Sequence, residues 1–580
     1  MTVNTESDAR EGLAPRVGFW VGLVVFGLLL LIPPPASMQR AVRALFADEI
    51  QAEVAGLPEF AGQAGADTDS QAYRQAERRA VADRARVMKA AAAVTALVAC
   101  WWITVALPIP VTSLLPLVLL PLVGVVPIKQ AAVPYANPNV FLFMGGFIIA
   151  LGIERWGLHR RIALHIVRLV GTGRSTIVLG FMLASALLSM WISNTAATLM
   201  MLPIGLAIIS AVKKLGKDED PKQIANFSAA LMLGIAYAAS IGGVCTPIGT
   251  PPNISFRGQM ARLFPLAPEI SFGQWMMVFM PLVVVFLPVV WLVLVRITCP
   301  TGKARTPVGR EVVARDLRGL GRMSRPEKLM LVIFTATALL WMTRSIPVGG
   351  VNYGWSGLLE GWLSPPGRSA CLFRADYISD ATVALGMAVL LFIIPAGRGA
   401  AGGTGGERRR EYLMNWETAQ RLPWGILLLF GGGFSIAVGF KASGLSFWCG
   451  QAFADVGIGS PLLVVVGVCL LMTFLTEITS NTATTEVMLP ILAGVGVAMG
   501  VNPLMLMLPA TISASCAFML PVATPPNAIV FGSGCIEMRR MVRSGIIINL
   551  IGVVLITTVF HLVAKPVLGI DLSTMPTWVE

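Results

Sequence analysis

The composition of this 580-residue chain defines its broad class. Hydrophobic residues make up 55% of it and charged residues 13%, and the mean hydropathy is +0.74. Because a soluble domain averages about 25% charged residues, we expect an all-α polytopic membrane protein. Basic cytoplasmic loops explain the net charge of +13, so nucleic acid is not an expected partner. Three histidines and eight cysteines without a CxxC spacing argue against a metal site or a disulfide framework.

Apolar runs of spanning length occur along the whole chain. They predict about 11 transmembrane helices in a multi-pass protein of the bacterial inner (cell) membrane, surrounded by lipid. The first helix lies within residues 1–35, and we favour a retained helix over a signal peptide because no convincing cleavage site follows it. A polar loop, a first repeat, a basic cytoplasmic linker, a second repeat and a C-terminal tail are then expected at 36–87, 88–296, 297–327, 328–564 and 565–580.

Two of the apolar runs, 176–209 and 460–497, are interrupted by the triplet Ser-Asn-Thr. Irregular backbone is tolerated inside a membrane only where it lines a cavity or is buried in protein. A hairpin that enters and leaves on one side therefore explains each run better than a single spanning helix does. The sequence predicts two re-entrant hairpins with the triplets at their tips.

The triplets belong to a longer repeat. Ser480 follows Ser193 by 287 residues, and the Gly-Gly-Phe segment at Gly145 recurs at the same separation. Further along, GTPPN at 249–253 corresponds to ATPPN at 523–527 with a separation of 274 residues. An odd number of spans in each half makes the second copy run in the opposite direction across the membrane. This is the inverted-repeat plan of secondary transporters, in which paired helix breaks mark the binding site.

The paired motifs are rich in oxygen atoms and contain no Lys or Arg. Proline prevents each Thr-Pro-Pro-Asn segment from continuing a helix, which frees carbonyl groups at one end and amide groups at the other. The carbonyls, together with Ser, Thr and Asn oxygens, suit Na⁺, and the amides suit an anion. Sodium would then balance the charge of a dianionic substrate. A lone Ser-Asn-Thr is usually a helix cap, but two at a shared spacing favour a binding site.

The second copy carries two acids that the first copy lacks. Glu477 and Glu486 correspond to Met190 and Leu199. Because acids inside a membrane are usually functional, a membrane-embedded hydrolase is one alternative. The sequence has no Ser/His/Asp constellation or metal-ligand pattern to support it, so we expect no enzyme activity. A channel is a weaker alternative, because paired ion sites on broken hairpins suit alternating access.

Several segments resemble the divalent anion/sodium symporter (DASS) family of di- and tricarboxylate and sulfate transporters. They are WWITVALPIPVTSLLP, FLFMGGFIIALGIERWGLHRRIAL, WISNTAATLMMLP, AYAASIGGVCTPIGTPPN, TEITSNTATTEVMLP and CAFMLPVATPPNAIVFGSG. The resemblance covers nearly all of residues 88–564. It implies a homodimer with scaffold and transport domains that works by an elevator motion. One departure is Val105, which stands where the family usually has glutamate.

The same resemblance implies two sodium sites with the substrate held between the hairpin tips. The first sodium ion would be bound by Ser189, Ser193, Asn194 and the backbone of Gly249. The second would be bound by Thr476, Thr479, Asn481 and the backbone of Ala523. The substrate would contact Ser193, Asn194, Thr195, Ser480, Asn481, Thr482, Thr524 and Pro525.

These features predict a sodium-coupled secondary symporter that imports C4-dicarboxylates such as succinate, malate or fumarate, with Na⁺ as the co-transported ion. A dicarboxylate exchanger and a sulfate or citrate carrier are alternatives on the same fold. An exchanger should lose a cation site, for example to a basic side chain, whereas both sites are complete in this sequence.

Overall fold

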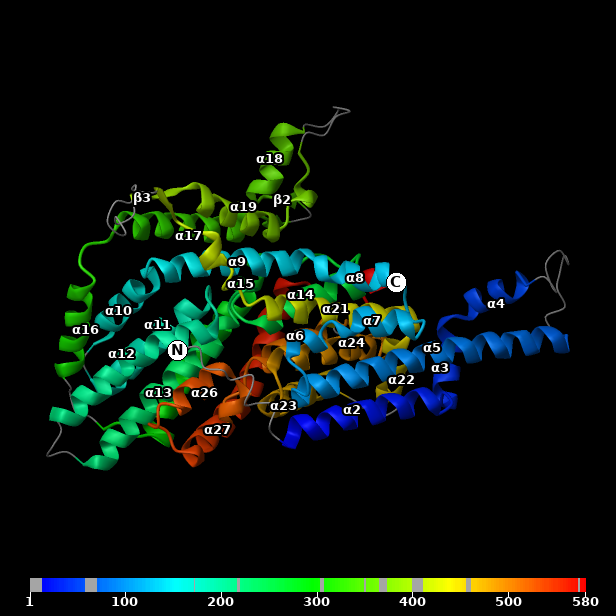
Figure 1. The fold of residues 1–580 in the computed structure, drawn as a ribbon, viewed down its shortest axis with the longest axis horizontal. Helices are drawn as coiled ribbons and strands as arrows, with labels where there is room; N and C mark the ends of the chain where they lie inside the picture. Colours follow the sequence, from blue (N-terminus) through cyan, green and yellow to red (C-terminus); the bar gives the residue numbers. More distant parts are fainter. Residues whose placement is uncertain are drawn as a thin grey trace, which may run out of the picture.

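Helices dominate the computed structural model of the chain (Figure 1). It describes residues 13–57, 70–171, 173–215, 220–302, 307–348, 351–364, 373–398, 410–454, 460–571 and 574–579. Within these residues, 10 helical segments are long and apolar enough to cross a membrane. They are Ala14–Leu31, Gln71–Thr104, Ile128–Arg155, Asn194–Lys214, Pro221–Gly243, Phe272–Thr298, Arg325–Thr343, Trp424–Ser443, Pro461–Ile478 and Met538–Val567. The chain is therefore an all-helical polytopic membrane protein.

The number of spanning helices differs slightly from the sequence prediction of about 11. The apolar run near 112–127 is interrupted and forms α6 (Ile109–Thr112) and α7 (Leu115–Leu122), in a proline-rich stretch. The later runs form α19 (Asp380–Ile393) and α25 (Leu504–Ala514), which are 14 and 11 residues long. One arm of each predicted hairpin reaches spanning length instead.

The N-terminal part forms two long helices that lie side by side. α2 (Leu13–Leu31) packs along α5 (Gln71–Thr104), where Gly18 leaves room for the side chain of Thr104 (Figure 1). The first half of α5 packs against α3 (Ala36–Leu45) and α4 (Ala47–Ala55). The described part of the segment expected as a polar loop is thus largely helical, and the expected boundary at residue 88 falls inside α5.

The first repeat contains the first hairpin, formed by α11 and α12, and the first helix break, between α13 and α14. Its elements are α8 (Ile128–Ala132), η1 (Val133–Ala136), α9 (Pro138–Arg155), α10 (Leu158–Val170), α11 (Arg174–Ser189), α12 (Asn194–Leu215), α13 (Pro221–Gly243), α14 (Pro251–Leu263), α15 (Phe272–Leu292) and the π-helical turn η2 (Val293–Thr298). The linker follows with α16 (Pro307–Gly319).

The second repeat contains the second hairpin, formed by α23 and α24, and the second break, between α25 and α26. Its helices are α17 (Arg325–Thr343), α18 (Trp355–Leu363), η3 (Ala375–Tyr377), α20 (Trp416–Ala419), α21 (Trp424–Ser443), α22 (Leu445–Ala454), α23 (Pro461–Ile478), α24 (Asn481–Ala498), η4 (Pro521–Ala523), α26 (Pro525–Phe531), α27 (Met538–Val559) and η5 (Phe560–Ala564). The C-terminal tail then contains α28 (Lys565–Val567) and η6 (Thr577–Val579).

Two short strand pairs extend from the second repeat. β1 (Pro347–Val348) pairs antiparallel with β2 (Val351–Asn352), and β3 (Pro395–Arg398) pairs antiparallel with β4 (Arg410–Tyr412). Both pairs lie near α17, α18 and α19, at the top of Figure 1. They are far from the hairpin tips in sequence and line neither of the two large cavities described below.

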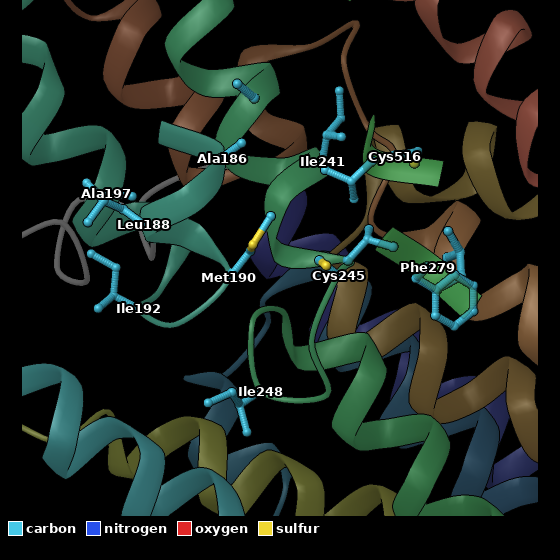
Figure 2. Close-up of a cluster of buried hydrophobic side chains, with 14 of the residues drawn as sticks. Ala186, Leu188, Met190, Ile192, Ala197, Ile241, Cys245, Ile248, Phe279 and Cys516 are labelled. Carbon is cyan, nitrogen blue, oxygen red and sulfur yellow. The ribbon is translucent and has the colours of Figure 1, made fainter. Parts of the chain in front are cut away.

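A continuous apolar core joins the two repeats. In the first repeat α11 packs closely on α13, where Gly242 meets the backbone of Ala186. Figure 2 shows Met190 of the first hairpin beside Cys245 of the break, with Leu188 and Ile192 farther from it. Across the repeats, Tyr237 Oη donates a hydrogen bond to the carbonyl oxygen of Phe518 at 2.6 Å. The hairpins and breaks are thus embedded in one packed body.

Candidate functional site

A cavity of about 620 Å³ lies between the two hairpin tips and the two helix breaks. The described residues that line it include no charged side chain, and apolar residues such as Phe143 and Phe147 complete its wall. Most of the predicted site residues line it: Ser193, Asn194, Thr195, Gly249, Ser480, Asn481, Thr482, Ala523, Thr524 and Pro525. The other three, which are buried, are Ser189, Thr476 and Thr479.

Several helices begin at this cavity. α12 begins at Asn194, α24 at Asn481 and α14 at Pro251, and all three residues line the cavity. At the first tip the Ala196 amide donates to Ser193 Oγ at 3.2 Å, so serine caps the start of α12. The free amides at a helix start carry a partial positive charge. The cavity therefore offers favourable surroundings for an anion without a Lys or Arg side chain.

The first hairpin tip contains a cluster of oxygen atoms. Asn194 Oδ1 accepts a hydrogen bond from Ser189 Oγ and lies 3.2 Å from the carbonyl oxygens of both Ala239 and Gly249. A Cβ atom at Gly243 would lie 2.6 Å from Asn194 Oδ1, so this position has room only for glycine. The Ser189 hydroxyl, Asn194 Oδ1 and the two carbonyl groups bring four oxygen atoms together with only one proton among them. Such a group suits a small hard cation. Turning the Asn194 amide over would place its Nδ2 against the same carbonyls, so the cluster can also satisfy itself without a cation.

The second tip shares one feature of this arrangement. Thr476 Oγ1 lies 2.5 Å from Asn481 Oδ1 and 3.0 Å from the carbonyl oxygen of Ala514, and it donates its single proton to one of these two acceptors at a time. Thr476 and Asn481 are the repeat partners of Ser189 and Asn194. The same contact between a hydroxyl and an amide oxygen therefore occurs in both copies.

Thr479 does not have an equivalent in the first tip, where Ile192 takes its place in the repeat. Its Oγ1 donates to the Leu475 carbonyl at 2.7 Å and contacts Thr484 Oγ1. These bonds lie within the second hairpin. The structure therefore connects Thr476 and Asn481 directly, while Thr479 bonds to its own hairpin arms.

The asparagine of each Thr-Pro-Pro-Asn segment holds the preceding break in place. Asn253 Nδ2 donates to the carbonyl oxygens of Gly243 at 3.2 Å and Thr246 at 2.8 Å. Asn527 Nδ2 donates to the corresponding carbonyls, which are those of Ala517 at 3.0 Å and Leu520 at 3.1 Å. Sequence reasoning did not assign these asparagines to the site, although their invariant place after Pro-Pro in both copies was a usable signal.

Glu477 has a structural explanation. Its Oε1 accepts from the amides of Phe518 at 2.7 Å and Met519 at 2.9 Å and from Asn549 Nδ2 at 2.7 Å, and its Oε2 accepts from the Leu520 amide at 3.0 Å. These amides lie in the irregular segment between the end of α25 at Ala514 and the start of η4 at Pro521, so they are not paired within a helix. The carboxyl group thus fixes the backbone of the second break rather than facing the cavity, and this geometry offers no support for hydrolysis.

A second cavity, of about 790 Å³, adjoins the first and shares Ser193 and Thr195 with it. It lies between α9 and α12 and is bordered by charged groups that include Glu154, Arg160 and Asp316. Burial lowers the pKa of His159, which also lines it. The central cavity therefore opens toward the side that carries the basic segments.

Comparison with known proteins decides the family. A family model described as the sodium:sulfate symporter transmembrane region matches residues 84–570. The chain belongs to the sodium:sulfate symporter family. The resemblance predicted from the sequence motifs is therefore confirmed, and the family is one of transporters.

Relatives of this sodium:sulfate symporter family member include two from staphylococci. The chain is 43% identical over 482 residues to the sodium-dependent dicarboxylate transporter SdcS of Staphylococcus saprophyticus. It is 44% identical over 482 residues to the SdcS protein of Staphylococcus aureus strain NCTC 8325. Each match covers 83% of this chain and 87% of the relative.

A solved structure supports the fold of this family member. The MtrF protein of Neisseria gonorrhoeae, described as illuminating a class of antimetabolite efflux pumps, aligns with a TM-score of 0.50 and 15% sequence identity. The alignment covers 75% of this chain and 82% of that chain. At this identity the likeness concerns the fold alone.

Proposed function

We propose that the protein is a sodium-coupled symporter that imports C4-dicarboxylates such as succinate, malate or fumarate across the bacterial cell membrane. The observation that carries the proposal is a pair of matching contacts between a hydroxyl group and an asparagine oxygen, on either side of one cavity whose described lining includes no charged side chain. The relatives at 43% and 44% identity are sodium-dependent dicarboxylate transporters, which agrees with this site.

The two oxygen clusters are proposed to bind sodium. Ser189, Ser193, Asn194 and the backbone of Gly249 hold the first ion, and the Ala239 carbonyl, 3.2 Å from Asn194 Oδ1, adds a ligand to this set. The second ion is held by Thr476, Thr479, Asn481 and the backbone of Ala523. The Ala514 carbonyl, 3.0 Å from Thr476 Oγ1, belongs to the same group.

The dicarboxylate is proposed to lie between the tips, where the helix starts and the two sodium ions balance its charge. Its contacts are Ser193, Asn194, Thr195, Ser480, Asn481, Thr482, Thr524 and Pro525, all of which line the central cavity. Without bound cations, a dianion in this cavity would face only backbone dipoles and neutral side chains. Sodium binding and substrate binding therefore depend on each other, which is the basis of coupling.

Two inverted repeats with re-entrant hairpins are proposed for the fold, over 88–296 and 328–564. The end of α9 contacts the segment that precedes α21: Arg155 Nη2 is 2.7 Å from Glu411 Oε1, and Trp156 Nε1 donates to the Leu413 carbonyl at 2.8 Å. Leu151 and Glu154 near the C-terminus of α9 also line the same cavity as Pro423 and Ile426 at the start of α21, which supports the inversion. An elevator motion in a homodimer is part of the same proposal and follows from the family resemblance.

Uptake of labelled succinate into proteoliposomes tests this function. An inward sodium gradient should drive accumulation, and replacing sodium by potassium should abolish it. Equal uptake with sodium and with potassium would contradict symport and favour dicarboxylate exchange. Competition by excess malate, fumarate, citrate and sulfate separates a C4-dicarboxylate carrier from a sulfate or citrate carrier.

A further inference from the structure

One acid in the second hairpin has no part in the site described above. Glu486 on α24 is fully buried. Ser255 Oγ donates to its Oε1 at 2.6 Å, and Gln259 Nε2 donates to its Oε2 at 2.6 Å, both from α14. Gly433 on α21 makes the room, since a Cβ atom there would overlap the carboxyl group. Glu486 therefore lies where α14, α21 and α24 meet.

No cation pairs with Glu486 in the part of the chain that the structure describes. Arg257 of α14 is bound by Glu269 and Asp380, and Lys441 of α21 donates to the Leu263 carbonyl. The titratable groups on the helices packed against α24, leaving out the polar first half of α5, are Lys89, Cys100, Arg257, Arg262, Lys441, Cys449, Cys469 and Glu477. A carboxylate buried without a cationic partner is strongly unfavourable, so this location suits the neutral acid.

The repeat partner of Glu486 has the opposite surroundings. Leu199 on α12 is 53% exposed and lines the 790 Å³ cavity that separates α12 from α9. Pro203, on the same helix, is also exposed, whereas its partner Pro490 on α24 is buried. α9 of the first repeat corresponds to α21 of the second. The second arm of the hairpin is packed on this helix in the second repeat (α24 on α21) but is separated from it in the first repeat (α12 from α9).

In a transporter built from inverted repeats, the opposite arrangement exchanges these two surroundings. Glu486 would then face water on the outer side of the membrane, where a carboxyl group is ionised at neutral pH. We propose that Glu486 binds a proton in the arrangement seen here and releases it to the external solution in the opposite one, so that low external pH favours this arrangement. This inference rests on the alternating transport proposed above.

The proton balance is simple. A carboxylate oxygen of Glu486 takes a proton from external water as the site closes and returns it to the same side when the site opens, so no net proton crosses the membrane. Binding of a single proton changes the ratio of the two arrangements by at most about tenfold per pH unit. The group therefore acts as a pH sensor rather than as a second coupling ion.

Alkylation of a cysteine at position 199 reports how much of the protein has the arrangement described above, in which this position lines an open cavity. Leu199→Cys is introduced with Glu486 intact and with E486Q, and the proteins are placed in lipid nanodiscs so that both sides have the same pH. The labelled fraction of the peptide that carries position 199 is quantified by mass spectrometry, so that the native cysteines do not contribute. The reactivity of the thiol depends on pH, and so does the charge of His159 in the same cavity. Both effects occur in the two proteins alike and cancel in the ratio of their labelling.

Between about pH 8 and about pH 6, labelling relative to E486Q should rise as the pH falls, by up to about tenfold per unit. Identical pH profiles in the two proteins would overturn the inference. Infrared spectra give a second test that needs no variant to fold: the wild-type protein at about pH 6, where an ordinary carboxyl group is still ionised, should absorb as a protonated buried carboxyl group. Absence of that absorption would overturn the inference as well.

The two proposals fail in different ways. E486Q should keep sodium-dependent succinate uptake, because Glu486 does not touch the site. If the wild-type protein shows no sodium-dependent uptake, the transport function is wrong. If uptake depends on sodium and the labelling profiles are identical, only the pH sensor is wrong.

Discussion

The two hairpins carry the same motif but lie in different surroundings, and this difference teaches how the molecule is arranged. In the first repeat a cavity of about 790 Å³ separates α12 from α9. In the second repeat α24 packs on α21, and residues such as Leu489 and Glu486 are fully buried. The central cavity is thus open on the side of the first hairpin and closed on the side of the second. Two copies of one motif held in unequal positions agree with the inverted repeats and the alternating access proposed above.

Replacement of the tip asparagines should have the largest effect on transport, because both hairpins carry an asparagine at this position. Asn194→Ala or Asn481→Ala removes one amide oxygen from a proposed sodium cluster, which should cost about 1–3 kcal/mol, or about 5- to 150-fold in sodium-driven uptake. Initial uptake rates measured over a range of sodium concentrations check this. Ser228→Ala is the control, since the Ser228 hydroxyl donates to the Ile224 carbonyl of its own helix. Wild-type rates in both asparagine variants would refute the paired site.

Gly243 is one point where the two breaks differ, since its repeat partner Ala517 already has a side chain. Gly243→Ala places a Cβ atom 2.6 Å from Asn194 Oδ1 and 3.0 Å from the Gly249 carbonyl oxygen. We expect a roughly tenfold loss of apparent sodium affinity, because the first cluster must widen. Gly386→Ala on α19 is the matched control, since its Cβ would meet open space. An unchanged sodium dependence in Gly243→Ala would separate this cluster from cation binding.

Glu477 stabilises only the second break, so its replacement should affect the two sides unequally. Glu477→Gln keeps the shape but turns one acceptor oxygen into a donor that faces backbone amides. The cost is about 1–3 kcal/mol of stability. A thermal unfolding midpoint in nanodiscs below that of the wild type checks this, and hydrogen exchange at Phe518–Leu520 should increase more than exchange in the first break. Equal exchange in the two breaks would show that the carboxyl group has another role.

The smallest effect is expected on the open side. Leu199→Ala changes a side chain that is 53% exposed, so stability should change by no more than about 0.5 kcal/mol. Leu489→Ala on the closed side removes a fully buried side chain and should cost about 2–4 kcal/mol. Denaturation midpoints of the two variants give the comparison. Similar losses in both would mean that the two hairpins are packed alike.

The hairpin tips and the breaks could be located from the sequence because their motifs consist of particular side chains. The common separation of the two copies also makes a chance match improbable. The carbonyl groups of Ala239 and Ala514 could not be predicted, because any residue supplies a carbonyl and only the fold decides which ones converge. The part played by Glu477 depends on α25 ending at Ala514, which the apolar run near 503–520 does not reveal. The span count differed from prediction where prolines interrupt a run that hydropathy alone treats as continuous.

The central claim is that two sodium clusters and one dicarboxylate site act together. Simultaneous uptake of radiolabelled sodium and radiolabelled succinate into the same proteoliposomes tests it most directly. The account predicts that at least two sodium ions enter with each succinate, because each hairpin tip holds one. A ratio of one sodium ion per succinate, or uptake of succinate without sodium, would contradict it.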